Sequence, residues 1–163
     1  DFHPDLETAL GGGAPERVIA LRPAALRAVR DTLSTAPAGR IDAVAVGSPH
    51  FSLSEFAQLE ALLPHAPFAV PFYVCTGRSE YRELEAAARL PRLEAAGIEI
   101  VVDTCVVVTP ILPPDGGVLM TNSGKFAHYT PPNTGYGVVY GSLEDCVRSA
   151  VRGRVARDEG LWS

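Results

Sequence analysis

Short apolar runs alternate with helix-like segments along most of this chain of 163 residues, and that alternation limits the possible folds most strongly. Apolar runs of about four to eight residues between turn residues are typical of strands buried on both faces of a parallel sheet. Parallel neighbours need a crossover connection, which is usually a helix. Strands are expected within five runs: Ile41–Val46, Phe68–Cys75, Ile98–Val108, Val118–Thr121 and Val138–Tyr140. The sequence therefore predicts an α/β fold with a mostly parallel sheet flanked by helices.

Helices are predicted between and after these runs, at residues 24–34, 53–63, 80–96 and 143–152. Two of them begin with a capping-box pattern, because Ser52 stands three residues before Glu55 and Ser142 three residues before Asp145. The helix at 80–96 is expected to break or kink at Pro91, since proline cannot donate a hydrogen bond inside a helix.

Two further expectations concern the margins of the sheet. Arg17–Leu21 has the composition of a short edge strand. Pro71 interrupts the run Phe68–Cys75. Because proline lacks a backbone N–H, this run is expected to be an edge strand or to contain a bulge. Residues 1–16, through the three glycines at 11–13, are predicted to be a linker or entry segment. Residues 17–163 are predicted to form one α/β domain, rich in loops because the chain has 15 glycines and 14 prolines.

Charge and apolar patterning exclude several classes of protein. The net charge is −5 and no cluster of Lys and Arg occurs, so a surface for nucleic acid or anionic lipid is not expected. No apolar run approaches the roughly 20 residues of a membrane helix, and no secretory signal is visible. The three cysteines, Cys75, Cys105 and Cys146, include no CxxC pair and do not form a disulfide pattern. We therefore expect a reducing, cytoplasmic location.

Polar and reactive side chains follow each predicted strand. In open α/β sheets, ligands bind beyond the carboxyl ends of the strands, where helix N-termini favour anions such as carboxylates. The side chains at these positions, in chain order, are Ser48, His50 and Ser52; Cys75, Thr76, Arg78 and Ser79; Asp103, Thr104 and Cys105; Asn122, Ser123, Lys125, His128 and Tyr129; and Ser142 and Cys146. Five such groups favour an active site over chance.

Simpler interpretations remain open for several of these residues. The segment Gly47–His50 is also typical of an ordinary turn, and Ser142 with Asp145 of a helix cap. Arg78 could be a solvated turn residue, and Cys75 is interpreted as structural. The segment Thr121–Tyr129 favours a functional site more strongly than a simple turn, because a hydroxyl, an amide, a cation, an imidazole and a phenol lie within nine residues. It lacks the glycine spacing of a P-loop, and no serine lies in the GxSxG turn of α/β hydrolases.

Four segments in the same order resemble the aconitase X family: Gly47–Glu55, Asp103–Cys105, Thr121–Tyr129 and Gly141–Cys146, the last followed by Ala150 and Gly153. The resemblance covers the chain from about Arg17 to Gly153 and implies one aconitase-like lobe of a hydro-lyase. Known members of the family dehydrate small hydroxy acids: cis-3-hydroxy-L-proline in bacteria and phosphomevalonate in archaea. We expect cis-3-hydroxy-L-proline for this chain. The alternatives are phosphomevalonate and a non-catalytic α/β module that binds a small acid.

The resemblance also implies iron, either as an iron–sulfur cluster or as a mononuclear ion, with Cys105 and Cys146 as ligands. It implies that a third ligand comes from an N-terminal region of the large subunit that this chain lacks. The base is expected on a swivelling domain, which is a small subunit or a fused segment. Of the residues here, Ser48, Asn122, Ser123, Lys125 and His128 are predicted to bind the substrate. His50, Ser52 and Lys125 are predicted to assist catalysis.

Overall fold

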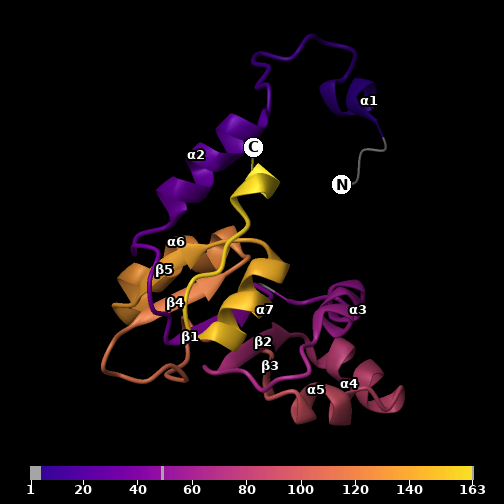
Figure 1. Cartoon of the computed structure of the whole chain (residues 1–163). Helices are drawn as coiled ribbons and strands as arrows, with labels where there is room; N and C mark the ends of the chain where they lie inside the picture. Colours follow the sequence, from indigo (N-terminus) through magenta and orange to yellow (C-terminus); the bar gives the residue numbers. More distant parts are fainter. Residues whose placement is uncertain (1–4, 49, 163) are drawn as a thin grey trace.

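The computed structural model describes residues 5–48 and 50–162, and its centre is one parallel sheet of five strands (Figure 1). The strands lie in the order β3-β2-β1-β4-β5, and each neighbouring pair is parallel. Their bounds are β1 Ala43–Val46, β2 Phe72–Thr76, β3 Ile98–Val102, β4 Val118–Thr121 and β5 Gly137–Tyr140. The predicted parallel α/β fold is confirmed.

Helices cover both faces of the sheet. Their bounds are α1 Leu6–Leu10, α2 Pro23–Leu33, α3 Leu53–Leu62, α4 Arg78–Ala86, α5 Leu90–Ala95, α6 Gly124–Thr134 and α7 Leu143–Arg152, followed by a 3-10 turn η1 Glu159–Trp162. Successive strand residues point to opposite faces, so Val44 and Val46 join one core cluster and Ala43 and Ala45 the other. Buried side chains of α3, α4, α5 and α7 belong to the first cluster. Phe126 of α6 and the loop after β3 belong to the second.

The strand order creates a switch point between β1 and β4. The chain runs outward from β1 through β2 to β3 and then returns to place β4 on the other side of β1. Connections on the two sides therefore leave in opposite directions, which opens a crevice at the carboxyl ends of β1 and β4. This crevice is where a ligand of such a sheet is expected.

The strand that contains Phe72 is an interior strand, so the prediction of an edge strand or a bulge is wrong. β2 begins one residue after Pro71 and lies between β1 and β3. The carbonyl of Pro71 accepts a hydrogen bond from the backbone N–H of Val44, 2.9 Å away. The proline thus stands ahead of the strand, where its missing N–H leaves no gap in the ladder.

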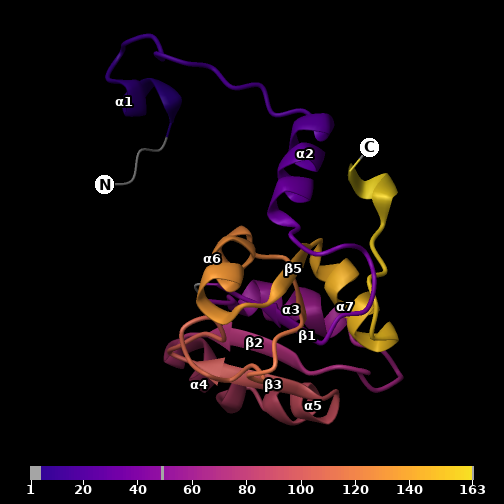
Figure 2. The same cartoon turned by 90° about the vertical axis from the view of Figure 1, so that its left-hand side faces the viewer.

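The predicted strand at Arg17–Leu21 is also wrong, since these residues form no strand. Val18, Ile19 and Leu21 are 66–81% exposed, and the segment belongs to an extended arm that joins α1 to α2. In both views this arm and α1 stand apart from the sheet (Figure 1 and Figure 2). Apolar β-branched residues alone do not make a strand where no neighbouring strand is available to pair.

Two helical segments differ from expectation. The predicted helix at 80–96 is two helices, α4 and α5, with the break at Ala88, whose φ is +54°, and with Pro91 in the first turn of α5. The sequence pattern predicts no helix in the polar segment after β4, but this segment starts α6, which contains Pro131 and Pro132 near its end. None of the helices in the described ranges combines the length and the apolar character that crossing a bilayer requires.

Candidate functional site

A pocket of about 270 Å³ lies at the switch point, between the carboxyl ends of β1 and β4. Two of the four segments that were singled out in the sequence, Gly47–Glu55 and Thr121–Tyr129, contribute to it. The lining residues are Gly47, Ser48, His50, Glu55, Asn122, Ser123, Gly124 and Lys125. Ser48, His50, Asn122, Ser123 and Lys125 were predicted as site residues, and the fold brings these five together from positions more than seventy residues apart.

Gly47 shapes the β1 side of the pocket. Its φ is +82°, and a Cβ atom there would lie 2.4 Å from the carbonyl oxygen of Cys75. The backbone of Phe51 donates to that same oxygen at 2.8 Å, and the Thr76 hydroxyl donates to the carbonyl of Phe51 at 2.7 Å. These bonds hold the turn after β1 against the end of β2, which places Ser48 and His50 at the pocket.

The N-terminus of α6 forms the β4 side. The hydroxyl of Ser123 caps the helix by accepting from the backbone N–H of Phe126 at 3.2 Å, and it donates to the carbonyl of Ser48 at 3.3 Å. One side chain thus ties the two halves of the pocket together. Lys125, in the first turn, is exposed. A helix N-terminus next to a lysine and the Asn122 amide suits a bound carboxylate.

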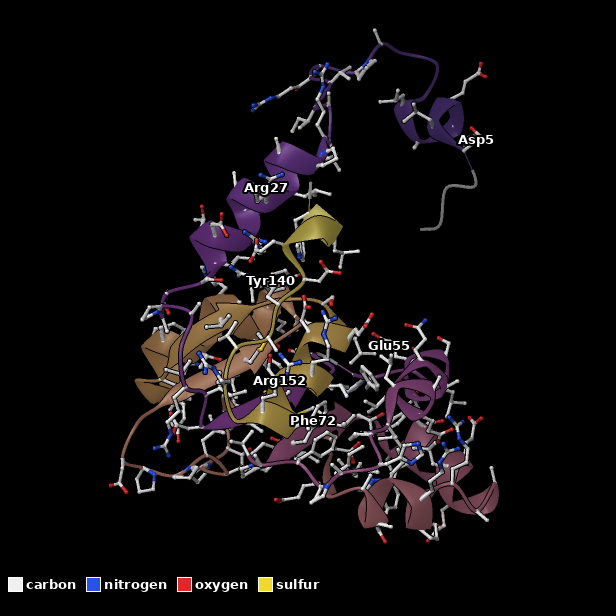
Figure 3. The ribbon with its side chains drawn as sticks, viewed as in Figure 1. Asp5, Arg27, Glu55, Phe72, Tyr140 and Arg152 are labelled. Atoms are coloured by element: carbon white, nitrogen blue, oxygen red, sulfur yellow. The ribbon has the colours of Figure 1, made fainter. Side chains whose placement is uncertain are left out.

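The N-terminus of α3 is occupied by its own carboxylate. Glu55 Oε2 accepts from the backbone N–H of Ser52 at 2.8 Å and from its hydroxyl at 2.7 Å, which completes the predicted capping box. Ser52 is therefore engaged within the helix turn and does not line the pocket. Glu55, which Figure 3 labels on α3, does line it. Sequence reasoning recognised Glu55 only as a cap, although the capping box already placed it beside Ser52.

His128 lies one turn further along α6 and does not line the pocket. Its ring is exposed and packs edge-on against Tyr129, with ring centroids 4.8 Å apart. The structure therefore separates His128 from the five site residues that it brings together.

The two cysteines predicted as iron ligands lie in different core clusters, on opposite faces of the sheet. Cys146 of α7 is fully buried with the cluster of Val44, and burial raises the pKa of its thiol. Cys105, after β3, packs half-buried against the cluster of Ala43. Among residues 5–48 and 50–162, no group of three or more His, Cys, Asp or Glu side chains could hold a metal ion. Because a third ligand is expected outside this chain, these positions do not test the predicted ligand roles of Cys105 and Cys146, which stay a prediction.

Cys75 behaves as the structural residue that the sequence indicated. Its side chain is fully buried in β2, and burial raises the pKa of its thiol to about 11, which keeps it protonated at neutral pH. The charge of the neighbouring Cys105 contributes to this raised pKa, and a hydrogen bond with the backbone of Val106 opposes it.

Arg78 is paired with a carboxylate and is more than a solvated turn residue. Asp103 Oδ1 accepts from the backbone N–H of Arg78 at 2.9 Å, and Oδ2 accepts from its Nε at 2.7 Å. Desolvation alone would raise the pKa of the Asp103 carboxyl, but the hydrogen bonds and charge of Arg78, together with His50, lower it below its ordinary value. The sequence showed both residues at strand ends but could not show that they pair.

A parallel sheet with a polar pocket at its switch point is the arrangement of ligand-binding α/β domains. Residues 41–152 match the model of the aconitase X third domain, and the chain belongs to the aconitase X family. The predicted resemblance is confirmed.

Individual relatives extend this comparison. The chain is 43% identical to a cis-3-hydroxy-L-proline dehydratase from Pseudomonas aeruginosa, over 98% of this chain and 28% of that protein. It is 31% identical to a phosphomevalonate dehydratase large subunit from Methanosarcina mazei, over 86% of this chain and 33% of that subunit. The crystal structure of the holo-form of aconitase X from Thermococcus kodakaraensis is similar with a TM-score of 0.67 and 28% identity, over 78% of this chain and 33% of that one. This chain thus spans about a third or less of the length of these relatives.

Proposed function

We propose that this chain is part of a hydro-lyase that removes water from a small hydroxy acid, with cis-3-hydroxy-L-proline as its substrate. The observation that carries the proposal is the 43% identity to a cis-3-hydroxy-L-proline dehydratase over nearly the whole chain. The pocket supports it, because its Lys125 and the N-terminus of α6 suit a carboxylate.

Each residue of the pocket has a proposed role. Lys125, Asn122 and Ser123 bind the substrate carboxylate at the N-terminus of α6, and Ser48 completes that wall. His50, on the β1 side, orients the hydroxyl that leaves. Ser52 acts indirectly by holding Glu55 at the pocket, since its hydroxyl already donates to that carboxylate. His128 lies outside the pocket lining, and its contact with the substrate stays a prediction.

Elimination of water also needs a Lewis acid for the hydroxyl and a base for the proton on the neighbouring carbon. Iron would supply the Lewis acid in a member of this family. We propose that the base and further iron ligands come from the rest of the large subunit and from a swivelling small subunit or domain, because this chain spans only part of its relatives. The three cysteines are free thiols, which supports a reducing, cytoplasmic location.

The complete enzyme that contains this chain tests the proposal. Dehydration of cis-3-hydroxy-L-proline and of phosphomevalonate is measured side by side, with Lys125→Met and Lys125→Arg as a matched pair. We expect turnover of the hydroxyproline, with kcat/KM about ten- to hundredfold lower in Lys125→Met and a smaller loss in Lys125→Arg, which keeps the charge.

Other outcomes point to the alternatives. Turnover of phosphomevalonate instead would favour the alternative substrate. The phosphomevalonate dehydratase large subunit from Methanosarcina mazei is 31% identical to this chain. Binding of L-proline without turnover of either compound, in enzyme loaded with iron, would favour a non-catalytic module.

A further inference from the structure

A second polar group lies next to the pocket, on the side of β2 and β3, and the proposed function does not use it. The group consists of Arg78, at the start of α4, and Asp103, directly after β3. Asp103 holds Arg78 through two hydrogen bonds, to the backbone N–H at 2.9 Å and to Nε at 2.7 Å. The side chains are 64% and 43% exposed, so the pair is open to a ligand.

The backbone of Asp103 is strained for this contact. Its φ is +59°, and among the described residues only Ala88 shares a positive φ without being glycine. Such a conformation costs about 1 kcal/mol or more and persists where the surrounding structure enforces it, often at functional sites. Here the backbone N–H of Asp103 is held by the carbonyl of Thr76 at 3.0 Å, which aims the carboxylate at Arg78.

The contact leaves the outer part of the guanidinium available. Asp103 engages Nε, while Nη1 and Nη2 of Arg78 have no hydrogen-bond partner among residues 5–48 and 50–162. A guanidinium held at one edge presents its other donors in a fixed direction, which is the geometry that binds a planar carboxylate.

His50 connects this pair to the pocket. It lines the pocket, and its Nδ1 lies 3.5 Å from where a Cβ on Gly77 would stand, directly before Arg78. Because β1 and β2 are neighbours, their carboxyl ends place His50 between the N-terminus of α6 and Arg78.

We propose that Arg78 is a second anion-binding residue of this site, which donates from its Nη atoms to the substrate carboxylate, and that Asp103 is its positioning residue. The inference rests on the proposed function and extends it: the carboxylate is bound from two sides, by the N-terminus of α6 with Lys125 and by Arg78. A carboxylate has two oxygens, and two separate donors fix its orientation as well as its position.

Three variants in the complete enzyme test this role. Arg78→Gln removes the charge, and Asp103→Asn removes the charge that holds Arg78 while keeping a residue type that tolerates positive φ. Arg92→Gln is the control, since Arg92 lies on α5, which leads into the amino end of β3, away from the site. We measure KM and kcat for cis-3-hydroxy-L-proline, the Kd for L-proline by calorimetry, iron content and melting temperature.

We expect Arg78→Gln to raise KM and the Kd for L-proline about ten- to hundredfold, with iron content unchanged and kcat less affected. Asp103→Asn should raise both about three- to tenfold, and Arg92→Gln should change neither. Unchanged KM and Kd in Arg78→Gln, with a lower melting temperature, would show that the pair only caps α4 and would overturn the inference.

The inference and the proposed function can fail separately. If the wild-type enzyme does not dehydrate cis-3-hydroxy-L-proline, the proposed function fails. The L-proline Kd of wild type against Arg78→Gln still decides whether Arg78 binds a carboxylate. If the wild type neither dehydrates the hydroxyproline nor binds L-proline, both fail.

Discussion

Gly47 shows how a single position shapes the pocket. The turn after β1 needs a positive φ there, and the end of β2 approaches so closely that a Cβ would meet the Cys75 carbonyl at 2.4 Å and Phe51 Cβ at 2.6 Å. Alanine would have to move the segment that carries Ser48 and His50. The glycine is therefore required both for conformation and for space.

Gly47→Ala should destabilise the protein by about 3 kcal/mol or more, because backbone strain and a steric clash add together. Gly135→Ala is the matched control: its φ is +76°, but no described atom lies within 4 Å of the new Cβ, so it should lose only about 1 kcal/mol. Urea denaturation measures both. Equal losses in the two variants would show that the turn adapts to a side chain.

Substitution by serine should cost different amounts of stability at Cys146 and at Cys105. Cys146→Ser puts a hydroxyl into a fully buried apolar cluster and should cost about 1–3 kcal/mol of stability. Cys105→Ser, at a half-buried position, should cost less than about 1 kcal/mol.

Iron content of the complete enzyme, measured beside unfolding, separates structural from ligand roles. If Cys105 is a ligand and Cys146 is structural, iron is lost only in Cys105→Ser. Iron lost also from a stably folded Cys146→Ser variant would support a ligand role for both cysteines.

At the scale of elements, α7 is fixed by one buried carboxylate. Asp145 is fully buried, and it accepts from the backbone N–H of Ser142 at 3.1 Å and from that of Asp158 at 2.8 Å, and also from Arg148. The first bond closes the capping box, and the second attaches the segment after α7 to the helix. A cap predicted from sequence thus also holds the C-terminal segment in place.

Asp145→Ala should destabilise the protein by about 2–4 kcal/mol, since it leaves two backbone donors and a guanidinium without their acceptor. Glu144→Gln, one residue earlier and 59% exposed, should change stability by less than about 0.5 kcal/mol. Both free energies of unfolding come from urea titrations. Similar values for the two variants would show that water replaces the lost acceptor.

The helix N-termini around the pocket also differ as elements. Glu55 occupies the N-terminus of α3, which leaves little room for an anionic ligand there. The first turn of α6 carries no acidic residue and contains Lys125. The preference of the pocket for a carboxylate therefore comes from α6 and not from α3.

At the scale of the whole molecule, we expect the N-terminal arm to contribute little to the stability of the sheet domain. Residues 5–22 are exposed almost throughout, and neither core cluster includes any of them. Deletion of residues 1–20 should therefore change the free energy of unfolding by less than about 0.5 kcal/mol.

Denaturant titration measures the effect of the deletion. A loss of stability above 1 kcal/mol would show that the arm packs against the domain.

The sequence was accurate where the determining interactions are local. Val118–Thr121 is a strand at the predicted residues, and Ser52 and Ser142 begin helices through the predicted capping boxes. It failed at Pro71 and at Arg17–Leu21, where the outcome depends on which strand lies alongside. It also did not predict α6, because Pro131 and Pro132 obscure a helix that its cap and the burial of Phe126 stabilise.

By itself, the sequence determined most of the strands and helices of an α/β domain, the family, and the polar residues that follow the strands. Strands and helices can be predicted in this way because hydrophobic periodicity and helix capping depend on residues close together in the chain. The tertiary structure alone decided the strand order, and with it the switch point that joins Ser48 to Ser123 and the pairing of Arg78 with Asp103. It also placed Cys105 and Cys146 on opposite faces. Such contacts arise from packing between segments far apart in the chain, which no local pattern encodes.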